Sequence, residues 1–175
     1  MLTLSYAIRE LERRRLLTHS RAGSGNDFVL RVEALIGAPL PPEAIELYRA
    51  EITSIGEFAA VLPAKRGSHG WQAGADDAVR SLLHVDALPL FFDGCGNLFG
   101  LDLTAGASRR AVYFFDHERG FAKPEYAVGS SIPAFLLVLA DHDRAIAERW
   151  PQGWELEIDP DLDKCPRAPP IWLAS

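Results

Sequence analysis

Cysteine and long apolar runs are both scarce in this chain. Its 175 residues include two cysteines, Cys95 and Cys165, and neither has another cysteine or a histidine at metal-ligand spacing. We therefore expect no disulfide framework, no zinc site and a reducing compartment. No run approaches the ~20 apolar residues of a membrane span. The N-terminal segment carries apolar residues ahead of its positive charges, which is the reverse of a secretory signal. These features predict a cytoplasmic protein without membrane association.

Positive charge is also in short supply. The chain has 18 lysines and arginines against 24 aspartates and glutamates, which gives a formal net charge of −6. Binding to phosphates needs a concentrated basic surface, and the only basic cluster is Arg13-Arg14-Arg15. The charge balance argues against direct contact with nucleic acid and favours basic or neutral partners.

Motifs of common enzyme and nucleotide sites are missing. Gly94-Cys95-Gly96-Asn97 lacks the lysine and hydroxyl residue of a P-loop and is expected to connect two strands, whereas a dinucleotide fingerprint connects a strand to a helix. No serine lies in a GxSxG elbow. Asp141-His142-Asp143 would be spread around a helix and so could not form a metal triad by itself. Cys95 has no nucleophile signature around it and is interpreted as a small turn residue. We expect no catalytic residue, no cofactor and no metal.

What the sequence does contain is a central stretch of apolar runs between glycine-containing breaks. It predicts strands at Leu88 to Phe92, Leu98 to Leu103 and Ala111 to Asp116, with Tyr126 to Val128 as a short addition. A helix introduced by Ser130 or Ser131, with Pro133 in its first turn, is expected to pack on one face of this sheet. The pattern predicts the α+β class, with a single mixed or antiparallel sheet flanked by helices.

Helices are also expected before the central sheet. Leu4, Ile8 and Leu11 form one apolar stripe, a second helix follows Asn26 or Asp27 and stops at Gly37, and a third begins near Pro42. Ala78 to Val85 has the composition of a short helix or an amphipathic connection. A first strand is placed at Glu57 to Leu62, although helical core contacts for Ile52, Ile55 and Phe58 are an equally good reading. The chain shows no internal repeat and is read as one domain over residues 1–175.

The C-terminal region carries an acidic series. Trp154, Leu156 and Ile158 alternate with Glu155, Glu157 and Asp159, the period-2 pattern of a half-buried edge strand. Such a charged face is either a solvated edge that discourages aggregation or a landing site for a basic partner. Trp71, in a glycine-rich polar segment, either covers an apolar edge or serves as a recognition anchor. Trp71, Glu155, Glu157 and Asp159 are thus the candidate partner-binding residues.

Carboxylates also follow the predicted strands, at Asp93, Asp102 and Asp116, the last with His117 beside it. They would suit an acid and base pair or a hard cation if they converged in one cleft. Aspartate is equally the usual residue for opening a turn.

Four segments, taken in order, resemble the SMI1/KNR4 (SUKH) superfamily. Val32 to Pro42 and the helix with Tyr48 are similar to that family's opening, Leu88 to Asp102 to its central hairpin, Val112 to His117 to its next strand, and Ser130 to Leu136 to its closing helix start. The resemblance covers about Asp27 to Asp143. Between Glu51 and Ala87 the chain departs from the family pattern, since the usual Asn-Gly-Gly turn is replaced by Glu51 to Gly56.

The resemblance implies a non-enzymatic binding role. Many bacterial members are immunity proteins that bind and neutralise a toxin domain, often a nuclease, and fungal relatives act as scaffolds. We therefore expect a toxin-neutralising immunity protein. The alternatives are a general interaction scaffold of the same fold, and a small hydrolase that uses the strand-end carboxylates.

Overall fold

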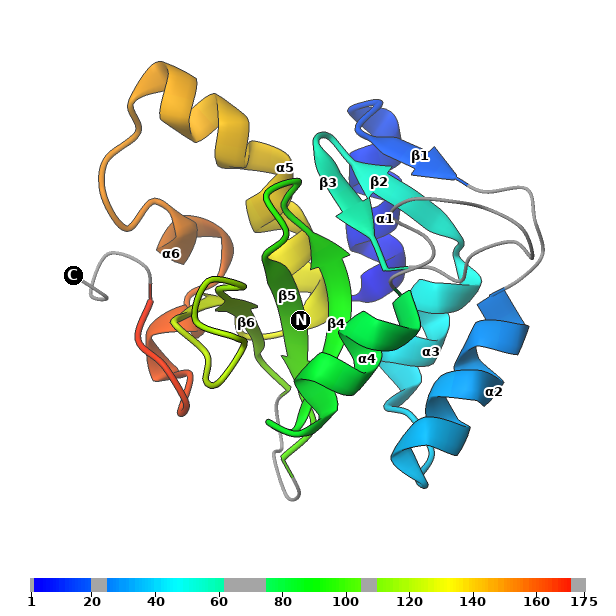
Figure 1. Ribbon diagram of the computed structural model, residues 1–175. Helices are drawn as coiled ribbons and strands as arrows, with labels where there is room; N and C mark the ends of the chain where they lie inside the picture. Colours follow the sequence, from blue (N-terminus) through cyan, green and yellow to red (C-terminus); the bar gives the residue numbers. More distant parts are fainter. Residues whose placement is uncertain (1, 20–24, 62–74, 105–109, 171–175) are drawn as a thin grey trace.

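The computed structural model describes residues 2–19, 25–61, 75–104 and 110–170, and these build one antiparallel sheet with helices on both faces (Figure 1). The strands are β1 (Leu17–His19), β2 (Ile52–Ile55), β3 (Phe58–Ala60), β4 (Ala87–Phe92), β5 (Leu98–Asp102), β6 (Val112–Phe115) and β7 (Tyr126–Gly129). The helices are α1 (Leu4–Arg13), α2 (Gly25–Ile36), α3 (Pro42–Arg49), α4 (Ala75–Leu83), α5 (Ile132–Glu148) and α6 (Glu155–Ile158), followed by the 3₁₀ turn η2 (Leu162–Lys164). The predicted α+β class and single sheet are confirmed.

The sheet is a meander in which each strand pairs with the next one along the chain, in the order β1 to β7. Its centre is the β4–β5 hairpin, where Phe91 lies opposite Phe99. Every residue of β5 is buried, because α4 covers one face and α5 the other. This double coverage explains why the central strands read as nearly continuous apolar runs. Among the described helices, none is both long and apolar enough to cross a membrane.

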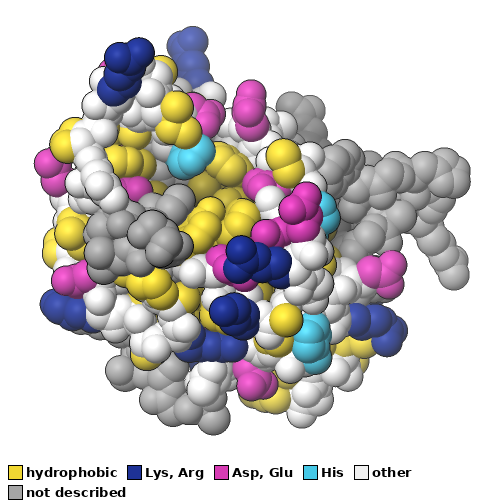
Figure 2. Space-filling model, turned by 60° about the vertical axis from the view of Figure 1, so that its left-hand side comes forward, with side chains coloured by type: hydrophobic (Ala, Val, Ile, Leu, Met, Phe, Trp, Pro, Cys, Tyr) yellow, Lys and Arg dark blue, Asp and Glu magenta, His cyan; other side chains and the backbone are white. Residues whose placement is uncertain are grey.

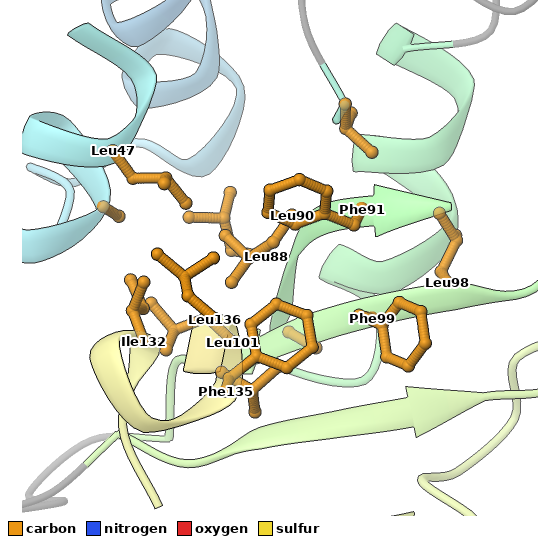
Figure 3. Packing of buried hydrophobic residues seen from close by; sticks show 14 of the residues in the cluster. Leu47, Leu88, Leu90, Phe91, Leu98, Phe99, Leu101, Ile132, Phe135 and Leu136 are labelled. Carbon is orange, nitrogen blue, oxygen red and sulfur yellow. The ribbon is translucent and has the colours of Figure 1, made fainter. Parts of the chain in front are cut away.

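The two faces of the sheet are filled by different side chains of β5. Phe99 points to α5, where its ring centroid lies 5.3 Å from that of Phe135, and Phe91 lies 5.8 Å from the same ring (Figure 3). Gly100, the next residue, faces α4, and a Cβ there would come within 2.8 Å of Leu82 Cδ1. Successive residues of a strand point to opposite faces, so one short strand organises both layers.

The helix starts follow the expected capping chemistry in two places. The Ser131 hydroxyl accepts a hydrogen bond from the Ala134 amide at 3.4 Å at the start of α5, with Pro133 in the first turn as predicted. Thr3 caps α1 in the same way. α2 begins at Gly25, earlier than the predicted cap at Asn26 or Asp27. The Gly25 amide donates to Glu51 at 3.0 Å, and a Cβ at Gly25 would lie only 2.5 Å from the Tyr48 carbonyl oxygen.

Two short elements, β1 and β2, differ from the sequence-based expectation, and a third, β3, follows it. β1 lies in a segment for which no helix or strand was predicted, and the helical reading of Ile52 and Ile55 is wrong because both lie in β2. The strand expected at Glu57 to Leu62 is present as β3. β1 and β2 are stabilised by antiparallel pairing with each other, in a register that places Leu17 opposite Ile55. Strands this short have too few residues to show an alternating pattern by themselves.

The edge strand predicted from Trp154 to Ile158 is also wrong, because this segment forms the helix α6. Helical turns close at Leu156, whose amide donates to the Gly153 carbonyl at 3.0 Å, and at Asp159, whose amide donates to the Glu155 carbonyl at 2.8 Å. Gly153 precedes the helix with a φ of 82°, a left-handed conformation that glycine adopts without strain. Alternation over five residues does not distinguish a strand from a single helical turn.

The junction between β7 and α5 is tightly packed at Gly129. A Cβ at this position would lie 2.6 Å from the Cβ, 2.7 Å from the backbone nitrogen and 2.8 Å from the Cα of Phe135. Only glycine allows the strand to approach the first turn of the helix this closely. The close approach of β7 to α5 therefore determines the position of Ser130 and Ser131, which connect the two elements.

Replacing Gly129 with alanine should therefore destabilise the fold by about 2 kcal/mol, because the new methyl group meets backbone that cannot rotate away. Urea unfolding measures the loss. Gly100→Ala is the matched control, since its two shortest contacts, with Leu82 Cδ1 and Phe115 Cε2, are to the far ends of side chains, and the Ala87 Cβ lies farther away at 3.3 Å. A smaller loss for Gly129→Ala than for Gly100→Ala would contradict this account.

Candidate functional site

A cleft of about 610 Å³ opens at the start of α5. Pro41, Pro42 and Glu43, at the start of α3, form one wall, and the chain from Ile158 to Asp161 forms the other. Ser130 and Ser131 lie between the walls, and Leu2, Leu101, Arg110 and Ala134 complete the lining. We call this space the α3–α6 cleft. Its volume falls within the range of about 300–1,000 Å³ that is typical of ligand pockets.

Asp159 connects the second wall to the start of α5. Its side chain is 3% exposed and accepts two hydrogen bonds from Ser130, one from the amide at 2.5 Å and one from the hydroxyl at 2.6 Å. A carboxylate beside a helix N-terminus is further stabilised by the helix dipole. Asp159 is therefore a buried structural group, and the expectation that it presents charge on the same surface as Glu155 and Glu157 does not fit its burial.

Glu43 is the carboxylate of the opposite wall. No hydrogen bond or ion pair joins its side chain to another residue in the described part of the chain, whereas Glu46, one turn later, accepts a hydrogen bond from the Ser5 hydroxyl at 3.1 Å. Much of the Glu43 side chain reaches solvent. Partial burial, and then the charge of Glu46, nevertheless raise the pKa of its carboxyl group. Glu43 thus presents an acceptor without a protein cation beside it.

The second wall continues into the acidic C-terminal segment. Asp161 pairs with Lys164 at 2.8 Å, and Glu157 is exposed. Burial raises the pKa of the Cys165 thiol to about 12, with Asp159, Asp163, Asp161 and Asp102 adding to the rise in that order. The thiol is therefore protonated at neutral pH and unreactive.

Glu155 is half-buried on α6. One of its carboxylate oxygens, Oε2, is buried without a hydrogen-bond partner among the described residues. Burial raises the pKa of this carboxyl group, and its own backbone amide and His142 act in the opposite direction. Figure 2 shows the side of the molecule where α5 and α6 lie, with acidic side chains dispersed among apolar and basic ones. Because Asp159 is buried, Glu155 is half-buried and Glu157 is exposed, the acidic series does not form a single charged face.

Asp102 has a structural partner in Arg167, although both lie near the cleft-lining Arg110. The Arg167 guanidinium contacts the Asp102 carboxylate at 2.9 Å and also donates to the Val85 carbonyl at 2.7 Å. Thr104 donates to the same carboxylate oxygen through its amide and hydroxyl groups. Arg110 donates to the Asp102 backbone carbonyl at 3.2 Å. This cluster, in which Asp102 is the buried member, attaches the C-terminal segment to the end of β5.

The structure separates the strand-end carboxylates. Asp93 and Asp116 lie where β4 and β6 end beside Leu98, whereas Asp102 lies at the other end of β5, about 13 Å away at the usual rise per strand residue. Asp93 accepts from the Cys95 amide at 2.8 Å and the Asn97 amide at 3.0 Å, as a turn-opening aspartate does. The four groups of the hydrolase hypothesis therefore do not line one cleft.

His117 belongs to the same turn cluster as Asp93. Its amide donates to the Asn97 side-chain oxygen at 3.0 Å, and its Nδ1 lies 2.8 Å from that oxygen. In the Asp141-His142-Asp143 segment, Asp141 pairs with Arg14 and Arg144. The His142 ring packs on Phe58, and its Nδ1 lies 3.1 Å from Asp143 Oδ1. Within residues 2–19, 25–61, 75–104 and 110–170, no group of three histidine, cysteine, aspartate or glutamate side chains could hold a metal ion.

Glu43 and Arg110 line the α3–α6 cleft but were not among the predicted site residues. Neither belongs to a motif, and the cleft brings together segments far apart in the chain. The available signals were Pro42-Glu43 at a helix start and the Ser130-Ser131 pair, which were interpreted only as capping features. Trp71 lies outside the described residues. Comparison with models of protein families, with curated proteins and with solved structures gives no match.

Replacing Asp159 with asparagine should release the second wall of the cleft. The asparagine oxygen can still accept from the Ser130 amide, but its NH₂ group then faces the Ser130 hydroxyl, which must change from donor to acceptor. The negative charge beside the helix N-terminus is also lost, so we expect a loss of about 1 kcal/mol in unfolding free energy. Amide hydrogen exchange should accelerate at Leu156 and Leu162. Asp163→Asn, on the exposed side of the same segment, is the control. Equal stability of the two variants would contradict the structural role of Asp159.

Proposed function

We propose that the protein is a non-enzymatic binding module of the SMI1/KNR4 type, and that it acts in the cytoplasm as an immunity protein that occludes a toxin domain. The observation that carries the proposal is the α3–α6 cleft, where Glu43 on one wall and the acidic C-terminal segment on the other meet above an uncharged serine pair. This arrangement suits the basic surface of a protein partner.

Two further observations support the proposal. The segments that resemble the SMI1/KNR4 family include β4, β5, β6 and the start of α5, which are neighbours in this fold. The net charge of −6 also suits a partner such as a nuclease domain, because enzymes that act on nucleic acid carry basic surfaces that bind phosphates. An acidic protein seated on such a surface would block access of the substrate and would associate quickly through electrostatic steering.

A general scaffold of the same fold is the alternative that shares these observations, and only the partner distinguishes the two. The hydrolase alternative is less well supported, because its carboxylates occupy opposite ends of β5 and are engaged in turns or in the Arg167 ion pair.

Co-expression tests the immunity role. A toxin domain encoded next to the gene should arrest growth when expressed alone in a bacterial host, and co-expression of this protein should restore growth. A complex that forms without restoring growth would favour the scaffold alternative. If no adjacent reading frame encodes a toxin domain, or if the toxin domain neither binds this protein nor is neutralised by it, the immunity role is wrong.

Variants then locate the contact surface. Trp71→Ala should weaken the complex by roughly thirtyfold if the indole is a recognition anchor. Charge reversal at Glu155 or at Glu157, one residue at a time, should slow association and reduce its salt dependence. Glu118→Lys, in the exposed turn after β6, is the control with the same change of charge. Unchanged binding by the variants at Trp71, Glu155 and Glu157 would exclude these residues from the interface.

A further inference from the structure

The start of each helix that borders the α3–α6 cleft has few amide groups left for an anion. In α5, the Ser130 amide donates to Asp159, Pro133 has no N–H group, and the Ala134 amide donates to the Ser131 hydroxyl. The Phe135 amide donates to the Ser131 carbonyl at 3.0 Å. Helix N-termini often bind anions through free amides. At the N-terminus of α5, the carboxylate of Asp159 already occupies this position.

The start of α3 is similar. Pro42 has no N–H group, and the amides of Ala44 and Ile45 both donate to the Pro41 carbonyl, at 3.0 and 3.1 Å. Glu43 itself adds a negative charge to this first turn. An anionic ligand would therefore meet a carboxylate on α3 and another at the start of α5, and would find few donors to compensate for them.

Cations are favoured by the same arrangement. Among the described residues, three carboxylates line the cleft, Glu43, Asp159 and Asp161, together with one guanidinium, that of Arg110. Asp159 is engaged by Ser130, and Asp161 contacts Lys164. Glu43 remains as the carboxylate to which no described residue supplies a hydrogen bond or a counter-charge. It is the acceptor that an incoming cation would reach without displacing an existing contact.

The remaining lining suits the aliphatic part of a long basic side chain. Pro41 and Pro42 on one wall and Ile158 and Pro160 on the other present apolar surface on both sides of the serine pair. Lysine and arginine bury their methylene groups against such surfaces while the charged end reaches a polar group. Proline also fixes its own φ angle, so the walls are preformed and little ordering is needed when a ligand enters.

We infer that the α3–α6 cleft receives a lysine or arginine side chain from the protein partner, with Glu43 as the carboxylate that binds its charged end. The inference rests on the proposed function and names the chemistry of the contact. The methylene groups of the incoming side chain lie between the proline walls, and the neighbouring backbone of the partner occupies the rest of the cleft.

Short peptides test the inference without the partner. In a ¹⁵N NMR titration, acetyl-Gly-Arg-Gly-amide or its lysine analogue should shift the amide signals of Glu43, Ser131 and Asp161 in a saturable way. The citrulline analogue has nearly the same shape but no charge, so it should bind more weakly, by up to about fivefold, which is the upper limit for a solvent-accessible ion pair. The glutamate analogue should not bind. Equal binding of the citrulline or glutamate peptide would overturn the inference.

Variants of α3 provide the matched control. Glu43→Gln should reduce affinity for the arginine peptide about fivefold, while Glu46→Gln, one turn away and outside the cleft lining, should leave it unchanged. Thermal unfolding verifies that both variants are folded. If Glu43→Gln binds the arginine peptide as well as the unmodified protein does, or if the shifts arise away from the cleft, the inference is wrong.

The two proposals fail in different ways. If the toxin domain is neutralised equally well by the Glu43→Lys variant, the partner does not use the cleft, and the inference is overturned while the immunity role stands. If the arginine peptide binds at Glu43 but no toxin domain is neutralised, the immunity role is overturned while the cation site stands.

Discussion

The close approach of β7 to the first turn of α5 is the constraint on which the rest of the structure depends. Gly129 permits it because a side chain there would overlap the backbone of Phe135. From this junction Phe135 reaches the rings of Phe91 and Phe99, which completes the core on one face of the sheet. The next residue, Ser130, holds Asp159 and with it the second wall of the cleft. One contact thus positions both the core helix and the candidate site.

The large elements of this fold follow from sequence patterns that involve only nearby residues. The β4–β5 hairpin is marked by apolar runs on both sides of a turn with Gly94 and Gly96, which have φ angles of 81° and 100°. α5 is marked by its serine cap, its proline and a long apolar segment. In each case the signal extends over enough residues to distinguish a period of 2 from a period of 3.6.

The short elements could not be predicted in this way. β1 has three residues and is stabilised by pairing with β2. Its own sequence therefore says little about whether the segment forms a strand. α6 has four residues, and its alternation of acidic and apolar side chains fits a strand equally well. Tertiary contacts decide such segments: the packing of α6 against α5 and the bonds of Asp159 to Ser130 favour the helical turn.

The same limit applies to the charged residues. In the sequence, Asp159 and Glu157 are members of one acidic series, yet Asp159 is buried against Ser130 and Glu157 is exposed. Glu43 and Glu46 lie one turn apart on α3, yet only Glu43 lines the cleft. A carboxylate's role depends on which donors lie beside it, and those donors come from segments far away in the chain. No local pattern could separate the structural acids from the available one.

This division of the acids bears on what the molecule does. Asp93, Asp102 and Asp159 accept hydrogen bonds or ion pairs that define a turn, the attachment of the C-terminal segment and a helix start. These carboxylates are engaged by donors within the fold. Removing such a donor lowers the stability of the protein by more than a typical surface ion pair contributes to it. No hydrogen bond or ion pair within the described parts of the chain engages the side chain of Glu43 or Glu157, and both are exposed. These two carboxylates can therefore accept a basic partner without breaking a contact that the fold uses, which is what the proposed binding role requires.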